Sequence, residues 1–165
     1  NQELVLTNQM TGLLNRRFID SVFVPQLYEQ NQLLPVGVIL ADIDHFKAVN
    51  DKYGHDVGDE VIIAVSKLLK QMVRTSDAVV RYGGEEFLIL LPNATVQQAA
   101  GVAQKIHENI NADKSQFSGN EQIATTLSFG VSSCFSAEDF DNTIKRADKL
   151  LYKAKDQGRN QVCTD

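Results

Sequence analysis

Cysteine is scarce in this sequence, and so are the features that mark a membrane protein. Cys134 and Cys163 are the only two cysteines, and their spacing is not that of a metal site, so we expect reduced thiols in a cytoplasmic domain. No apolar run approaches the length of a bilayer span, and no signal peptide is recognisable. If a longer parent protein is anchored in a membrane, we expect this domain on the cytoplasmic side.

Basic residues are not in excess either. Lys and Arg number 16 against 21 Asp and Glu, which gives a formal net charge of −5. A protein that binds nucleic acid non-specifically carries a basic face, so we expect no nucleic-acid partner. An enzyme that acts on nucleotides is not excluded, because a bound metal ion and a few cations are enough to hold phosphates.

Internal repeats, low-complexity stretches and Pro/Gly-rich linkers are absent too. With 165 residues, 43% of them hydrophobic, the chain is long enough to bury one ordinary core. We therefore expect a single domain over residues 1–165. Because the chain starts abruptly at Asn1, we expect it to be excised from a longer regulatory protein.

Apolar periodicity, by contrast, is clear, and it predicts the element order α-β-α-β-β-α-β-α. Asn15 is a candidate cap for the first helix, Pro25 should bend it, and Gly158 should end the last helix. This order predicts an α+β fold with a palm-like β-α-β-β-α-β core, a mixed central sheet flanked by helices. The predicted helices cover residues 15–27, about 58–72, 99–110 and 144–154, and the predicted strands cover 36–41, 79–80, 87–91, 123–134 and a short 161–164.

Two adjacent carboxylates stand at the mouth of a predicted buried strand, in RYGGEEF (residues 81–87). Glu85 and Glu86 repel each other unless a cation lies near them. The strand that ends at Asp42 should neighbour this hairpin, which brings Asp42 and Glu85 to one rim of the sheet. Such hard oxygen ligands suit Mg²⁺, and palm-type nucleotidyl transferases hold two metals in this way. The alternatives are a solvated hairpin tip and loop-capping roles for Asp42 and Asp44.

Five short motifs, in order and at fitting distances, resemble the GGDEF family of diguanylate cyclases, in its GGEEF form. They are NQMTGLLNRR, DIDHFKAVNDKYGHDVGDEVI, RYGGEEF, TLSFG and ADKLLYKAKDQGRN, and they span essentially the whole chain. The resemblance implies a nucleotidyl cyclase-like palm. It also implies a bacterial signalling enzyme that condenses two GTP into the second messenger cyclic di-GMP and releases two pyrophosphates.

The resemblance also implies the metal ligands. Asp42 and Glu85, together with the main-chain carbonyl of Ile43, would hold Mg²⁺, or Mn²⁺ as a substitute, with two ions in each active half-site. Glu86 ranks lower as a ligand because strand alternation turns it to the other face. Glu85 would also take the proton from the attacking 3′-hydroxyl, although activation of that hydroxyl by the metal explains the step equally well.

Phosphate binding is implied for residues at two places in the chain. The backbone N–H groups of His45 and Phe46, where a strand passes into a helix, would cradle phosphates. The side chains of Lys155 and Arg159 would supply cations to the same phosphates. Lys47 would offset charge in the transition state, although surface lysines are usually only solubilising.

Guanine recognition falls to Asn50 and Asp59. A carboxylate accepts from both N1–H and the exocyclic amine of guanine, whereas adenine offers no such pair, so Asp59 favours GTP over ATP. The alternatives are that Asp59 is a helix N-cap beside Gly58, and that the enzyme also accepts ATP.

RTSD, Arg74 to Asp77, resembles the R-x-x-D product-inhibition site of the family. Arg74 would stack on or pair with the product, and Asp77 would accept from guanine N–H groups. The alternative is a solvated helix end with a local ion pair. The sequence departs from the family at Asn8, where Asp is usual; we expect Asn8 to bond Arg16 or Arg17, with weaker coupling to an upstream segment.

Because each half-site would hold one GTP and the reaction needs two, we expect a homodimer in which two protomers face each other across a two-fold axis. We expect an upstream sensory or receiver domain of the parent protein to control this encounter. The main rival function is a binding module that senses GTP or cyclic di-GMP without turnover. A template-directed polymerase palm is a further rival, but no basic strand-holding surface is apparent.

Overall fold

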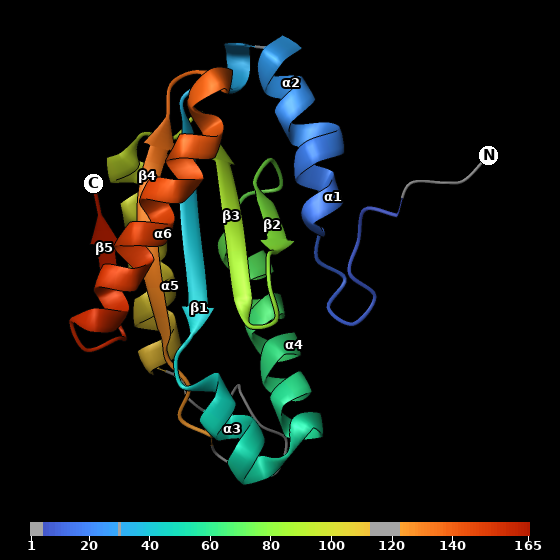
Figure 1. Ribbon diagram of the computed structural model, residues 1–165, viewed down its shortest axis with the longest axis vertical. Helices are drawn as coiled ribbons and strands as arrows, with labels where there is room; N and C mark the ends of the chain where they lie inside the picture. Colours follow the sequence, from blue (N-terminus) through green and yellow to red (C-terminus); the bar gives the residue numbers. More distant parts are fainter. Residues whose placement is uncertain (1–4, 30, 113–122) are drawn as a thin grey trace.

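The computed structural model describes residues 5–29, 31–112 and 123–165. Its centre is a five-stranded sheet in the order β2-β3-β1-β4-β5 (Figure 1). The strands β4 and β5 run parallel, whereas the other neighbouring pairs are antiparallel, so the sheet is mixed, as predicted. The strands are β1 (Val36–Ile43), β2 (Ala78–Arg81), β3 (Glu86–Pro92), β4 (Leu127–Cys134) and β5 (Val162–Thr164).

Helices cover both faces of this sheet (Figure 1). The long helices are α4 (His55–Met72), α5 (Val96–Ala112) and α6 (Phe140–Asp156). Shorter segments are α1 (Arg16–Phe18), the π-helix η1 (Ile19–Phe23), α2 (Val24–Glu29), α3 (Phe46–Tyr53) and the 3₁₀ turns η2 (Asn31–Leu33) and η4 (Ala137–Asp139). Within the described residues, no helix is both long and apolar enough to cross a membrane.

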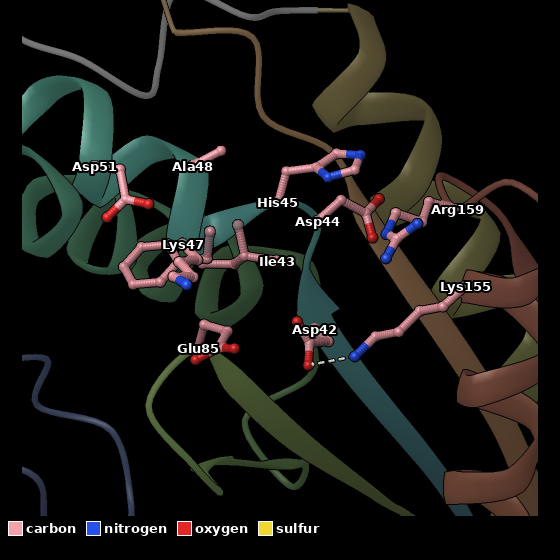
Figure 2. Close-up of a pocket in the computed structure, with 11 residues that line it drawn as sticks. Asp42, Ile43, Asp44, His45, Lys47, Ala48, Asp51, Glu85, Lys155 and Arg159 are labelled. Carbon is pink, nitrogen blue, oxygen red and sulfur yellow. Dashed lines mark hydrogen bonds and ion pairs between the residues drawn. The ribbon is translucent and has the colours of Figure 1, made fainter.

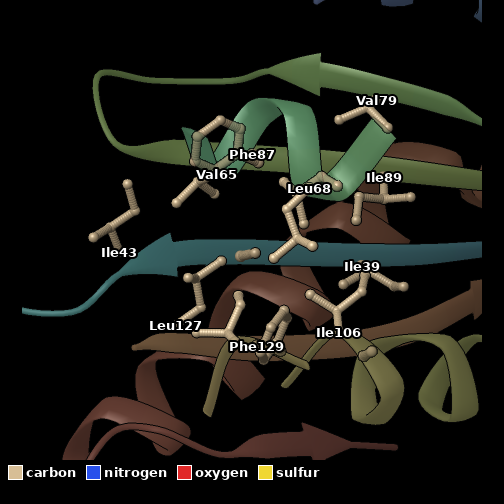
Figure 3. Packing of buried hydrophobic residues seen from close by; sticks show 14 of the residues in the cluster. Ile39, Ile43, Val65, Leu68, Val79, Phe87, Ile89, Ile106, Leu127 and Phe129 are labelled. Carbon is tan, nitrogen blue, oxygen red and sulfur yellow. The ribbon is translucent and has the colours of Figure 1, made fainter. Parts of the chain in front are cut away.

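All eight residues of β1 are buried, because this strand is central and both of its faces are covered. Ile39 and Ile43 pack into the core on the side of α4 and α5, with side chains such as Val65 and Ile106 (Figure 3). Alternate residues such as Val38 pack into a second core on the side of α2 and α6. A strand that is buried on both faces has a continuous run of apolar residues in its sequence. For this reason β1 could be predicted from the sequence.

Helix α6 lies unusually close to β4 at Gly130. A Cβ atom built at Gly130 would collide with the main-chain carbonyl of Ala147 and the nitrogen of Leu151. Only glycine leaves room for this approach of helix backbone to strand. The close packing sets the height of α6 above the sheet, and with it the position of the residues at the carboxyl end of the helix.

The helix predicted from about residue 58 is present as α4, but it begins earlier than predicted, at His55. Two helices occupy this region, α3 and α4, and Gly54 separates them with a φ of +92°. Gly58 lies buried within α4. Apolar periodicity missed the first turn of α4 because that turn is mainly polar.

The first predicted helix is interrupted. It widens into the π-helix η1 immediately before α2, whose second residue is Pro25. Proline has no N–H for the usual bond to the residue four positions earlier, and a wider turn accommodates this loss. Asn15 occupies the N-cap position but makes no side-chain capping bond; its amide donates to the carbonyl of Val5 instead (3.1 Å).

Candidate active site

A cavity of about 460 Å³ opens at the carboxyl end of β1, where the chain passes into α3 (Figure 2). It brings together most of the residues predicted to bind metal and phosphates. Those that line it are Asp42, Ile43, His45, Phe46, Lys47, Glu85, Lys155 and Arg159. The cavity is therefore built from β1, the start of α3, the β2–β3 hairpin and the end of α6.

The pairing of β1 with β3 explains why the two predicted metal ligands lie together. Asp42 stands opposite Glu86 in the antiparallel register, and the N–H of Ile43 donates to the carbonyl of Glu85 (3.1 Å). Glu85 is thus held at the tip of the hairpin beside the end of β1. Figure 2 shows the side chains of Asp42 and Glu85 on the same side of the cavity.

The hairpin glycines do not adopt the left-handed conformation that only glycine favours, since neither Gly83 nor Gly84 is among the residues with positive φ. A Cβ atom at Gly84 would meet nothing within 4 Å. The absence of a side chain at Gly84 therefore leaves open space beside Glu85, which suits the approach of a bulky ligand.

Negative charge is in excess around Asp42. Burial raises the pKa of Asp42, and the charges of Glu85 and Asp44 raise it further, whereas Lys155 lowers it. The ammonium of Lys155 donates to Oδ2 of Asp42 at 2.8 Å. A divalent cation between the carboxylates would relieve the remaining repulsion.

Glu86 does not line this cavity. Its pKa is raised by burial and then by the charges of Asp42 and of Asp148 on α6, while Lys155 opposes the rise. Among the described residues, no group of three or more His, Cys, Asp or Glu side chains has a metal-binding arrangement. Two carboxylates with a main-chain carbonyl still fit Mg²⁺, which usually takes one or two carboxylates and fills its other positions with water and phosphate oxygens.

The start of α3 and the end of α6 supply the groups predicted to bind phosphates. His45 is the N-cap of α3 and has a left-handed backbone conformation (φ 55°); the first N–H groups of a helix have no acceptor within it. At the end of α6, Gly158 has a φ of +114°, and its N–H donates to the carbonyl of Lys155 (3.3 Å), while the N–H of Arg159 donates to that of Ala154 (2.9 Å). These two bonds form a Schellman motif, which confirms that Gly158 ends the helix.

The predicted guanine-binding pair lies outside the cavity. Asn50 on α3 packs against α4, where a Cβ atom at Gly58 would collide with its Oδ1. This buried oxygen has no hydrogen-bond partner among the described residues. Asp59 is exposed and lies inside α4, whose N-cap is Gly54, so the alternative of Asp59 as an N-cap is wrong.

Arg74 and Asp77 lie at the other end of β3 from Glu85. Nη2 of Arg74 donates to Oδ1 of Asp77 (2.9 Å) and to the carbonyl of Pro92 (2.9 Å), while Nε and the backbone N–H of Arg74 donate to Oδ2 of Asp77. The side chain of Asp77 is 2% exposed, against 58% for Arg74. The pair borders two cavities of about 420 and 240 Å³, so the predicted local ion pair is present and two cavities lie beside it.

Asn8 bonds a different arginine from the two that were expected. Nη1 of Arg81 donates to Oδ1 of Asn8 (3.3 Å), and Nη2 of Arg81 donates to the carbonyl of Gly84 (2.9 Å). The guanidinium of Arg16 instead lies 4.0 Å from the centre of the Tyr82 ring. The expectation for Arg16 or Arg17 was wrong, because strand β2 carries Arg81 between the N-terminal turn and the hairpin.

Three further residues line the cavity without having been predicted as site residues. They are Asp44, Ala48 and Asp51. The D-x-D spacing made Asp44 visible, and helical periodicity places Asp51 one turn after Lys47 on the same face of α3. The sequence could have identified this face of α3, but only after α3 had been recognised as a helix distinct from α4.

A family model described as "Diguanylate cyclase, GGDEF domain" matches residues 5–161. The chain belongs to this family. Diguanylate cyclase DosC of Escherichia coli strain K12 is 38% identical over 154 residues, which cover 93% of this chain and 34% of DosC. This GGDEF domain thus spans about a third of the length of that relative.

Solved structures of GGDEF domains share the fold. Diguanylate cyclase SiaD of Pseudomonas aeruginosa, crystallised with its activator SiaC, superimposes with a TM-score of 0.84 at 32% identity, covering 97% of this chain and 62% of SiaD. The GGDEF domain of DgcB from Caulobacter crescentus, in complex with c-di-GMP, gives a TM-score of 0.83 at 28% identity, covering 99% of this chain and 98% of that one. The predicted α+β palm is confirmed.

Proposed function

We propose that this GGDEF domain condenses two GTP molecules into cyclic di-GMP with release of two pyrophosphates. The observation that carries the proposal is the meeting of Asp42, from the end of β1, and Glu85, from the tip of the β2–β3 hairpin, in a cavity that also contains Lys155 and Arg159. Carboxylates for a divalent cation and side-chain cations for phosphates are the two requirements of nucleotidyl transfer. Membership of the diguanylate cyclase family supports GTP as the substrate.

A divalent cation, Mg²⁺ or Mn²⁺ with two ions in each half-site, would be held by Asp42, Glu85 and the carbonyl of Ile43. When bound, it would neutralise phosphate charge and acidify the ribose hydroxyl. Glu86 is a poorer candidate because it does not line the cavity. Glu85 would also accept the proton of the 3′-hydroxyl, although activation of that hydroxyl by the metal explains the step equally well.

Phosphates would be bound by the N–H groups of His45 and Phe46 and by the side chains of Lys155 and Arg159. The ammonium of Lys155 already forms an ion pair with Asp42. It therefore lies between the proposed metal ligand Asp42 and the phosphates that it would bind. Lys47 borders the same cavity and would offset charge in the transition state.

Guanine would be recognised by Asn50 and Asp59. The exposed carboxylate of Asp59 is free to accept from adjacent N–H donors of the base, and Oδ1 of Asn50, which lies close to Gly58, has no hydrogen-bond partner among the described residues. Competition by ATP in a GTP turnover assay tests this selectivity. Strong inhibition by equimolar ATP would contradict it.

The product would bind at Arg74 and Asp77 and inhibit the enzyme. The two cavities beside this pair support the proposal, and the GGDEF domain of DgcB was crystallised with c-di-GMP. Because the pair lies at the opposite end of β3 from Glu85, inhibition there would act at a distance from the reaction.

Catalysis would require two protomers facing each other across a two-fold axis, since the metal and phosphate residues of the described part of the chain gather at a single place, the cavity at the end of β1. Upstream sensory or receiver segments of a longer cytoplasmic or membrane-attached parent protein would control this encounter. Turnover per enzyme should fall on dilution. A rate strictly proportional to enzyme concentration down to very high dilution would contradict the dimer.

The decisive experiment is incubation of the chain with GTP and Mg²⁺, followed by chromatography for cyclic di-GMP. Glu85→Ala should lower the rate at least about a hundredfold, because it removes a cation ligand and a proton acceptor. Glu29→Ala, at an exposed position at the end of α2, is the matched control and should leave the rate unchanged. Binding of GTP without any product from the wild type would instead identify a sensing module.

A further inference from the structure

Asp44, the second carboxylate of the D-x-D stretch, is a buried residue at the edge of the cavity, and both of its oxygens accept hydrogen bonds. It is 5% exposed. Its Oδ1 accepts from the hydroxyl of Ser128 (2.6 Å), and its Oδ2 accepts from the hydroxyl of Thr126 (2.6 Å) and from the backbone N–H of Asn160 (3.0 Å). One side chain therefore joins the end of β1, the start of β4 and the segment that follows α6.

The segment after α6 has a backbone conformation that needs such support. Arg159 and Asn160 have φ angles of 62° and 51°, and two successive non-glycine residues in the left-handed region are unfavourable unless surrounding contacts hold them. The N–H of Asn160 donates to Asp44 and to the hydroxyl of Ser128 (3.1 Å). Arg159, the residue just before, lines the cavity.

Residues of helix α5 also form hydrogen bonds with Asn160. Nε2 of His107 donates to the carbonyl of Asn160 (2.8 Å). The side-chain amides of Asn111 and Asn160 exchange a reciprocal pair of hydrogen bonds (3.0 and 3.1 Å). Because α5 satisfies the carbonyl and the side chain, Asp44 and Ser128 are the partners of the remaining backbone group.

We propose that Asp44 is a positioning residue, which holds the Arg159–Asn160 turn and thereby places the guanidinium of Arg159 in the cavity, and that it is not a metal ligand. The role of Arg159 in phosphate binding rests on the proposed function. The hydrogen bonds of the two aspartates support different roles for them, metal binding for Asp42 and positioning for Asp44. Oδ2 of Asp42 accepts from Lys155, whereas each oxygen of Asp44 already accepts a short hydrogen bond from a hydroxyl of the protein.

Three substitutions separate positioning from metal binding. Asp44→Ala removes the charged one of the two acceptors of the Asn160 N–H and leaves only the hydroxyl of Ser128. Asp44→Asn keeps an acceptor for this N–H and can donate its own amide to Ser128, but it has no charge and is a poor ligand for Mg²⁺. Thr126→Val is the matched control, because it removes a different donor to the same carboxylate and leaves the bond from Asn160 intact.

The first measurement is hydrogen exchange of the Asn160 amide by NMR, in the protein without metal or nucleotide. We expect exchange at least about tenfold faster in Asp44→Ala, and near wild-type rates in Asp44→Asn and Thr126→Val. Thermal melting of each variant checks that it is folded. An unchanged exchange rate in folded Asp44→Ala would overturn the proposal. This measurement does not depend on any catalytic activity.

The second measurement is steady-state turnover of GTP, with kcat and KM separated. Asp44→Ala should raise the KM for GTP about tenfold, as loss of a supporting bond to a binding residue typically does, and Asp44→Asn should restore most of the loss. In an Arg159→Ala background, Asp44→Ala should change KM less than twofold, because Asp44 acts through Arg159. Additive effects of the two substitutions would contradict this coupling.

Metal dependence provides the last readout. The Mg²⁺ concentration that gives half-maximal turnover should be the same in Asp44→Asn as in the wild type. A large increase in Asp44→Asn, with the Asn160 amide still protected, would identify Asp44 as a metal ligand and overturn the proposal. Absence of cyclic di-GMP from the wild type would refute the proposed function alone, because the exchange measurement would still test the positioning role.

Discussion

The ammonium of Lys155 lies 2.8 Å from Oδ2 of Asp42 and joins the last turns of α6 to the end of β1. The carboxylate of Asp42 is nearly buried and stands near the charge of Glu85, so both effects raise its pKa, and Lys155 counters them. Lys155 is the group that favours the ionised form of Asp42 against these effects. Metal binding requires the ionised carboxylate.

Replacing Lys155 should raise the pKa of Asp42 further. In Lys155→Met, we expect this pKa to be higher than in the wild type, because an opposite charge in direct contact with a carboxylate lowers its pKa and the substitution removes that charge. The ¹³C chemical shift of the Asp42 carboxyl group, followed as a function of pH in metal-free protein, measures it. Lys153→Met, at an exposed position on the same helix, is the control. An unchanged pKa in Lys155→Met would refute the importance of the pair.

Neutralising Glu86 should stabilise the metal-free protein. Burial and the charge of Asp42 raise the pKa of Glu86, so the folded state binds a proton more tightly than the unfolded state and loses stability as pH rises through this pKa. Glu86→Gln removes that loss. The melting temperature should rise by about 1–3 °C at pH 8, with no gain once the pH is below the usual carboxyl pKa.

The control for Glu86→Gln is Glu138→Gln, at an exposed position in η4. It should show no gain that depends on pH. Thermal melting in the presence of a chelator, at several pH values, measures both variants. An equal gain for Glu86→Gln at pH 8 and at pH 4 would show that the ionised form of Glu86 is not the cause of the gain.

A methyl group at Gly58 should disturb nucleotide binding, since it would collide with Oδ1 of Asn50. We expect Gly58→Ala to weaken the affinity for a non-hydrolysable GTP analogue about tenfold, as loss of one well-placed polar contact does. Isothermal titration calorimetry measures this. In Gly101→Ala on α5, the added Cβ meets nothing within 4 Å, and this control should bind normally and be stabilised by about 0.5–1 kcal/mol. Equal affinities in both variants would contradict the proposed role of Asn50.

Arg74→Ala should relieve product inhibition without lowering the initial rate. The guanidinium is the exposed partner of the pair, while Asp77 is buried and keeps its bond from the backbone N–H of Arg74 (2.8 Å). The variant should therefore stay folded. Initial rates with added cyclic di-GMP measure the effect, and we expect the inhibitory concentration to rise at least about tenfold. Inhibition as strong as in the wild type would place the product elsewhere.

Sequence alone determined the elements whose signals are local. The apolar run of β1, the glycine turn between β2 and β3 and the Gly158 end of α6 were predicted correctly, because each depends on residues a few positions apart. Motif resemblance identified the family. Local signals failed where the chain departs from regular periodicity, at the break between α3 and α4 and at the π-helix η1.

Only the tertiary structure decided which of these residues meet. Lys155 bonds Asp42 across 113 positions, Asn160 bonds Asp44 across 116, and Arg81 bonds Asn8 across 73. None of these pairs follows from periodicity or turn chemistry, because each depends on the register of the sheet and on the height at which α6 packs over it. The physical reason is that local sequence specifies the conformation of a segment, whereas packing of distant segments determines which polar groups satisfy one another.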